Sequence, residues 1–158
     1  MEKIIVGIAE GKIAHSGQSL ISYALGSCVG VCLYDQGRGI AGMAHIVLPR
    51  RGDFPGQSNV YKFADTGIQK LLGELTACGA RRTEIRAKIA GGARMFGTRG
   101  PDWEIGARNV EMVKKALAAV CIPLMAEDTG RDYGRTLILY ADDAQLEIRS
   151  VRHATKVI

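Results

Sequence analysis

The sequence predicts an α+β layered sandwich, in which mixed β-sheets carry two amphipathic helices on the outside. Apolar runs that fit strands cluster towards both ends of the chain, and two segments have helical spacing. Of the 158 residues, 47% are hydrophobic and 23% charged, which is typical of a globular domain that buries its own core. No repeat or linker divides the sequence, so we expect one domain over residues 1–158.

Strands are expected first along the chain. The opening 48 residues consist of apolar runs bounded by glycine, Asp35 or Pro49, a pattern typical of strands. The expected strands span residues 3–10, 19–25, 28–35 and 39–49. Residues 50–59, RRGDFPGQSN, contain a proline and two glycines, and we expect a loop there.

Helical periodicity begins near Val60, and Gly79 stands where a C-terminal cap would lie. The apolar positions of this first helix are Phe63, Ala64, Ile68, Leu71, Leu72 and Leu75. A second helix is expected from near Gly106, and its apolar face is Val110, Val113, Leu117 and Val120. Four more strands are expected at residues 83–90, 121–128, 135–141 and 145–151.

Composition argues against several functional classes. No window approaches the roughly 20 apolar residues of a membrane span, and the apolar run at the N-terminus is too short for a signal peptide. We therefore expect a soluble, cytoplasmic protein without membrane insertion.

No CxxC pair is present and no histidine stands at ligand spacing from a cysteine, so we expect no metal. The net charge of +5 favours acidic partners. Basic and aromatic residues do not interleave as in RNA-binding proteins, so we expect no nucleic acid partner.

One of the four cysteines, Cys28, differs from the others in what precedes it. Gly26 permits a close backbone approach, and the small side chain of Ser27 need not shield the thiol. Backbone N–H groups at such a turn could face a developing oxyanion. Cys28 is therefore a candidate nucleophile, with Gly26 and Ser27 as candidate oxyanion-binding positions. Inert packing is the role we expect for Cys32, Cys78 and Cys121.

His45 offers a base for this thiol. It lies in the apolar stretch GMAHIVLP, where a lone histidine is usually a core residue hydrogen-bonded to the backbone. Two consecutive expected strands, however, carry one cysteine and one histidine. If these strands pair, His45 could take the proton of Cys28 and stabilise the thiolate. The residues alone leave both roles open, since such pairs often arise by chance.

Two further patterns indicate structure rather than chemistry. The run Gly91-Gly92-Ala93 lacks the GKS/T ending of a P-loop and the GxGxxG spacing of a dinucleotide fold, so we interpret it as close backbone packing. The acid pairs Glu127-Asp128 and Asp142-Asp143 are expected at strand ends or turns. Neither suits the two-carboxylate type of acid–base catalysis.

Six motifs follow one another along the chain: LGSCVGVCLYD, GIAGMAHIVLP, YKFADTGIQKLLGEL, AKIAGGARMF, IGARNV and EDTGRDYGRTL. In residues and order they closely resemble the CheD family of bacterial chemotaxis proteins. The resemblance implies a cysteine hydrolase, a protein-glutamine glutaminase that deamidates selected glutamines of chemoreceptors. It also implies a layered sandwich similar to the catalytic domain of cytotoxic necrotizing factor toxins.

The resemblance further implies roles for three residues. The family nucleophile falls on Cys28 and the family base on His45. The third member of the family site, a threonine, falls on Ser22, which keeps a hydroxyl to orient His45 but lacks the methyl group that restricts rotamers. A second departure is Thr129-Gly130, where the family has two glycines.

Partners and alternatives also follow from the resemblance. Chemoreceptors would be the substrate, and CheC, a phosphatase of the chemotaxis response regulator, would be a regulatory partner. No cofactor is implied, and we expect a monomer. Two alternatives remain open: a non-catalytic regulatory module for a CheC-type phosphatase, and a receptor methylesterase that uses the same cysteine.

Overall fold

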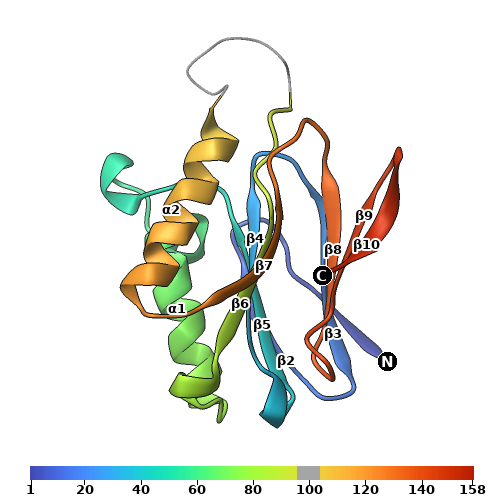
Figure 1. Cartoon of the computed structure of the whole chain (residues 1–158). Coiled ribbons are helices and arrows are strands. Elements are labelled where there is room, and N and C mark those ends of the chain that lie inside the picture. The colour runs from blue at the N-terminus through green and yellow to red at the C-terminus, as the bar shows by residue number, and fades with distance from the viewer. Residues whose placement is uncertain (96–103) are drawn as a thin grey trace.

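The described part of the chain, residues 1–95 and 104–158, forms two α-helices and two five-stranded sheets. In this computed structural model the elements stack as three layers (Figure 1). The helices cover one face of a central sheet, and an outer sheet covers the other face. The predicted α+β sandwich with helices on the outside is therefore confirmed.

Each sheet mixes parallel and antiparallel pairs. In spatial order the central sheet consists of β2 (Gly11–His15), β5 (Ile40–Ile46), β4 (Val29–Asp35), β6 (Arg86–Gly91) and β7 (Leu124–Thr129). The outer sheet consists of β1 (Glu2–Ile5), β3 (Gln18–Leu25), β8 (Arg135–Tyr140), β9 (Leu146–Ser150) and β10 (His153–Val157). The helices are α1 (Ala64–Ala77) and α2 (Ile105–Ala119).

Strand β4 lies in the middle of the molecule and is buried over its whole length. Val31 and Leu33 face the helices and belong to the core between the helices and the central sheet. Cys32 and Tyr34 face the opposite way, into the core between the two sheets. Burial on both faces explains why the strand is a continuous apolar run rather than an alternating one.

All expected strands and both expected helices are present, but two strands were not predicted. β2 is a short edge strand that pairs with β5 from Gly11 opposite Ala44 to His15 opposite Ile40. β10 forms a hairpin with β9, and each of its residues is exposed, so it has no apolar face to detect. The first expected strand, residues 3–10, ends earlier, at the end of β1.

The packing role expected for three cysteines holds for one of them. Cys32 is fully buried between the sheets, as predicted. For Cys78 and Cys121 the prediction is wrong, because both thiols are exposed. They lie just beyond the C-terminal ends of α1 and α2, where the chain turns at the surface. Neither α-helix in the described residues is long and apolar enough to cross a membrane.

Candidate active site

Residues 26–28 form the turn at which the chain crosses from the outer sheet to the central sheet. Strand β3 ends just before this turn and β4 begins just after it. Two backbone hydrogen bonds from the end of β6 hold it in place. The Gly92 N–H donates to the Cys28 carbonyl at 2.8 Å, and the Ala93 N–H donates to the Gly26 carbonyl at 2.9 Å.

Glycine is required where this turn packs most closely. Gly91 has a φ of +113°, and a Cβ there would lie 2.3 Å from the Cys28 carbonyl oxygen. A Cβ on Gly26 would lie 2.8 Å from Cγ of Met95. The close packing predicted for the double glycine is confirmed, whereas the neighbour of Gly26 is the side chain of Met95 rather than backbone. Together these contacts fix the backbone of Cys28.

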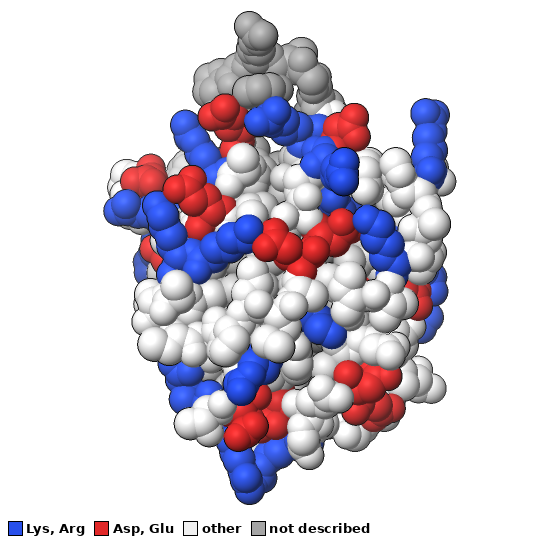
Figure 2. Space-filling model, in the orientation of Figure 1, with Lys and Arg blue, Asp and Glu red and all other residues white. Residues whose placement is uncertain are grey.

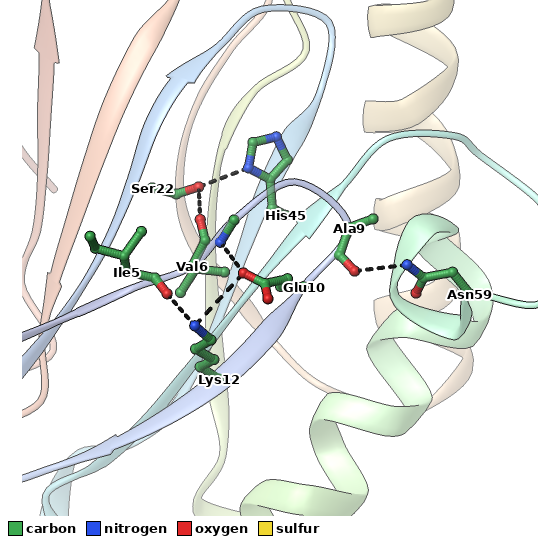
Figure 3. A network of polar contacts seen from close by, with 9 residues as sticks. Ile5, Val6, Ala9, Glu10, Lys12, Ser22, His45 and Asn59 are labelled. Carbon is green, nitrogen blue, oxygen red and sulfur yellow. Dashed lines mark hydrogen bonds and ion pairs between the residues drawn. The ribbon is translucent and has the colours of Figure 1, made fainter.

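Ser22 and His45 are in direct contact. Ser22 lies on β3 in the outer sheet and His45 on β5 in the central sheet, and both side chains are buried. The Oγ of Ser22 lies 2.8 Å from Nδ1 of His45 and 2.8 Å from the Val6 carbonyl oxygen (Figure 3). The hydroxyl that stands where the family has threonine therefore reaches the imidazole across the gap between the sheets.

These two contacts determine the tautomer of His45. A serine hydroxyl carries one proton, and a carbonyl oxygen can only accept. Ser22 must therefore donate to Val6 and accept a hydrogen bond from Nδ1 of His45. The proton of the neutral imidazole is thus on Nδ1, and Nε2 carries the free lone pair. Nε2 is the nitrogen that can act as a base.

The loop between β1 and β2, which presents the Val6 carbonyl, is held at several points (Figure 3). Lys12 forms an ion pair with Glu10 at 3.7 Å, and the side-chain amide of Asn59 donates to the Ala9 carbonyl at 3.2 Å. Two backbone hydrogen bonds, of 2.9 and 3.1 Å, join the loop to the backbone of the histidine on β5. The acceptor for the serine hydroxyl is therefore fixed relative to the imidazole.

Strand register places Cys28 on the same face of the central sheet as His45. Gly30 of β4 lies directly opposite His45 of β5. Side chains two residues apart on an extended chain point to the same face, so Cys28 shares the face of Gly30 and Cys32. Consistently, Cys28 packs against the core between the sheets, to which Cys32 belongs. Diagonal positions on paired strands lie close enough for side chains to interact.

Burial favours the uncharged forms of both candidate groups. Desolvation raises the pKa of the Cys28 thiol, and the residue's own backbone N–H partly opposes this effect. Desolvation lowers the pKa of His45. The resting pair is therefore a thiol and a neutral imidazole. A neutral imidazole is ready to accept a proton, and a thiol with a raised pKa needs a base to become a nucleophile.

The backbone amides of the turn are available as donors. Among the described residues, the N–H groups of Gly26, Ser27 and Cys28 donate no hydrogen bond to another residue. N–H groups that have no acceptor on another described residue, next to a candidate nucleophile, suit the stabilisation of an oxyanion. Within residues 1–95 and 104–158, no group of three or more His, Cys, Asp and Glu side chains is placed to hold a metal.

Two groups at the site were not identified from the sequence. The Val6 carbonyl could not be, because every residue carries a carbonyl and no side-chain pattern marks this one. Asn109 of α2 is fully buried, and its side chain donates to the Ser27 carbonyl. The signal that could have found it is an asparagine on the apolar face of an amphipathic helix, where polar residues need buried partners.

Comparisons with known proteins agree with the family resemblance of the sequence motifs. The family model described as "CheD chemotactic sensory transduction" matches residues 47–150. The chain is 45% identical over 161 residues to a protein of Moorella thermoacetica, and 42% identical over 159 residues to one of Lachnoclostridium phytofermentans. Each alignment covers 99% of this chain, and they cover 96% and 99% of the two relatives, respectively. Both relatives are named "Probable chemoreceptor glutamine deamidase CheD".

A solved structure shares the fold. The crystal structure of a Neisseria meningitidis protein described under the family model DUF152 superposes with a TM-score of 0.56 and 8% sequence identity. The superposition covers 87% of this chain and 74% of the other. At so low an identity this likeness concerns the fold alone. The identity shared with full-length relatives and the match to the family model show that this chain belongs to the CheD family.

Proposed function

We propose that this chain is a chemoreceptor glutamine deamidase, which hydrolyses the side-chain amide of selected receptor glutamines to glutamate and ammonia. The observation that carries the proposal is the hydrogen bond between Ser22 and His45, which leaves Nε2 of His45 as a free base. Cys28 lies on the same face of the sheet and would be the nucleophile. The names of the full-length relatives support the substrate class.

The first half of the reaction forms a thioester. Nε2 of His45 takes the thiol proton while the sulfur of Cys28 attacks the carbonyl carbon of the glutamine side chain. The backbone N–H groups of Gly26, Ser27 and Cys28 hold the oxyanion of the tetrahedral adduct. His45 then gives its proton to the departing nitrogen, the C–N bond breaks and ammonia leaves.

The second half of the reaction releases glutamate. The neutral imidazole of His45 takes a proton from water, and the oxygen attacks the thioester carbon. When the C–S bond breaks, the imidazolium returns its proton to the sulfur of Cys28. One water is consumed and one ammonia released for each glutamine, and the steps use only groups of this chain. The new carboxylate adds a negative charge to the receptor, which would bias its signalling state.

We also propose the setting of this reaction. All four cysteines are free thiols, as expected in the reducing cytoplasm, where we place the chain. A CheC-type phosphatase is the proposed regulatory partner, on the strength of the family resemblance. Adding such a phosphatase to the purified chain should produce a complex in size-exclusion chromatography, and two separate peaks at micromolar concentrations would contradict this partner.

Mass spectrometry of receptor fragments incubated with the wild-type chain tests the proposed reaction. Deamidation through the thioester raises the mass of a glutamine peptide by about 1 Da, because an NH₂ group is replaced by OH. A methylesterase would instead remove methyl groups from methylated receptor glutamates. A purely regulatory module would leave every receptor mass unchanged, and that result would refute the proposed activity.

A further inference from the structure

We infer that Asn109 is a positioning residue of the candidate site and that it directs the backbone N–H of Cys28 towards the oxyanion. The inference deepens the proposed function and rests on it, since it assumes that Cys28 is a nucleophile for acyl groups. Among the described residues, the hydrogen bonds of the Asn109 side chain go to backbone carbonyls and not to the thiol or the imidazole, so Asn109 acts through the backbone.

Asn109 links the turn that carries Cys28 to the end of the strand that carries His45. Its side chain is fully buried beneath α2. Nδ2 donates one hydrogen bond to the Ser27 carbonyl at 3.0 Å and another to the Val47 carbonyl at 2.9 Å. Ser27 precedes Cys28, and Val47 follows the end of the strand that carries the histidine. Both amide hydrogens are thus committed to these carbonyls, and Oδ1 has no partner among the described residues.

The bond to Ser27 fixes the orientation of one peptide group. The Ser27 carbonyl and the Cys28 N–H belong to the same peptide unit, and no peptide bond in the described residues is cis. In a trans peptide the C=O and N–H point in opposite directions. Asn109 draws the carbonyl towards the helix layer, so the Cys28 N–H points towards the opposite side of the central sheet. That side is the one that His45 faces.

This arrangement prepares an oxyanion donor before substrate binds. The Cys28 N–H has no acceptor on another described residue, and its direction is set by a bond on the far side of the sheet. Removing one oxyanion donor costs about 100- to 1000-fold in kcat in well-studied hydrolases. Without Asn109 the peptide could rotate, so the N–H would be present but less well aligned. We therefore expect a loss of about 10- to 100-fold in acyl transfer.

Two small reagents separate this role from a general loss of structure. Acylation of Cys28 by p-nitrophenyl acetate forms an S–C bond through a tetrahedral oxyanion, then breaks the ester C–O bond and releases p-nitrophenolate. Alkylation by iodoacetamide forms an S–C bond and expels iodide, and no oxyanion arises. Both reactions need the thiol and its base. Only the first needs an aligned Cys28 N–H.

The variants are Asn109→Leu, which removes both donors at similar size, and Asn109→Asp, which keeps the shape but cannot donate to carbonyls when ionised. Two variants are used so that the test can still be made if one of them does not fold. Val113→Ala is the matched control, because Val113 is fully buried one turn further along α2 and is not bonded to the turn. Each variant carries Cys78→Ser and Cys121→Ser, since those exposed thiols would otherwise react with both reagents.

The expected result is a fall in the acylation rate of about 10- to 100-fold in both Asn109 variants, with alkylation within about threefold of the parent. Val113→Ala should leave the ratio of the two rates unchanged. Unchanged acylation, or equal losses in both reactions, would overturn the inference. The ratio of the acylation rate to the alkylation rate is measured without a receptor. The role of Asn109 and the proposed action on receptors can therefore fail separately. If the wild type leaves receptors unmodified but the ratio shifts as expected, the proposed substrate fails and the role of Asn109 stands.

Discussion

At the scale of single residues, the hydroxyl of Ser22 decides which nitrogen of His45 carries the proton. Ser22→Ala removes the one hydroxyl among the described residues that accepts from Nδ1, and it leaves the Val6 carbonyl without the donor described above. We expect kcat for deamidation to fall about 10- to 100-fold, because a misoriented base transfers protons poorly. Ser22→Thr keeps the hydroxyl and should retain activity within about threefold. Wild-type turnover by Ser22→Ala in an ammonia-release assay would remove Ser22 from the mechanism.

The lowered pKa of His45 predicts the acid side of the pH profile. Burial disfavours the imidazolium, so the pKa of His45 lies below the usual value of about 6.5. Activity needs the neutral imidazole. As the pH is lowered, kcat/KM should therefore stay constant until the pH falls below the usual pKa of histidine. Measuring kcat/KM between pH 5 and 8 checks this, since it reports pKa values of the free enzyme. An acid limb at or above about pH 6.5 would contradict a buried neutral base.

Sequence identifies the candidate pair better than it identifies the groups that hold the pair. Cys28 and His45 could be predicted because a thiol and an imidazole are rare and their strands are consecutive. The family resemblance then singled them out and added Ser22. The Val6 carbonyl and Asn109 act through contacts that depend on how the sheets and helices pack, and no local spacing encodes these contacts.

At the scale of elements, the end of β6 supports the turn that carries the proposed nucleophile. Gly91→Ala would place a methyl group 2.3 Å from the Cys28 carbonyl oxygen and strain a residue with φ of +113°. We expect the turn to shift and kcat to fall about 10-fold or more, because displacements of about 1 Å are costly in catalysis. KM should change less than kcat. The measurement is steady-state ammonia release alongside thermal unfolding.

Gly56→Ala is the matched control for that prediction. Gly56 also has a positive φ, of +88°, but a Cβ there would have no neighbour within 4 Å. It should carry a similar backbone cost without moving the turn. Equal effects of the two substitutions on kcat would show that strain alone, and not contact with Cys28, explains the loss.

Strand prediction worked best where burial dictates the residue pattern. The continuous apolar run of β4 was recognised because both of its faces are buried. β2 and β10 were missed because each depends on pairing with a neighbouring strand rather than on an apolar pattern of its own. Such edge strands are decided by tertiary contacts that a single sequence does not display.

At the scale of the whole molecule, the candidate site exists because two sheets meet. Ser22 comes from the outer sheet and His45 from the central sheet, and Cys28 lies in the turn between β3 and β4. An ion pair also joins the sheets: the buried Arg135 of β8 donates from Nε to Asp128 of β7 at 3.1 Å. On the face shown in Figure 2, acidic and basic side chains lie side by side.

That ion pair gives a prediction about stability. Asp128→Ala leaves the buried guanidinium of Arg135 without its carboxylate, and we expect a loss of about 3–5 kcal/mol in the free energy of unfolding. Glu127→Ala is the control, because its partner Lys114 is exposed and such pairs contribute about 0–1 kcal/mol. Urea unfolding of both variants measures the difference. If both variants lose the same free energy of unfolding, the ion pair between the sheets stabilises the fold no more than an exposed ion pair does.

Cys28 is the proposed nucleophile that attacks receptor glutamines. The most direct test is mass spectrometry of candidate receptors incubated with the wild type, with Cys28→Ala and with Cys78→Ala, whose cysteine is exposed but lies outside the site. We predict that the wild type and Cys78→Ala each raise the mass of specific receptor glutamines by about 1 Da. Cys28→Ala, provided that it is folded, should leave the receptor masses unchanged. Deamidation by folded Cys28→Ala would show that Cys28 is not the nucleophile.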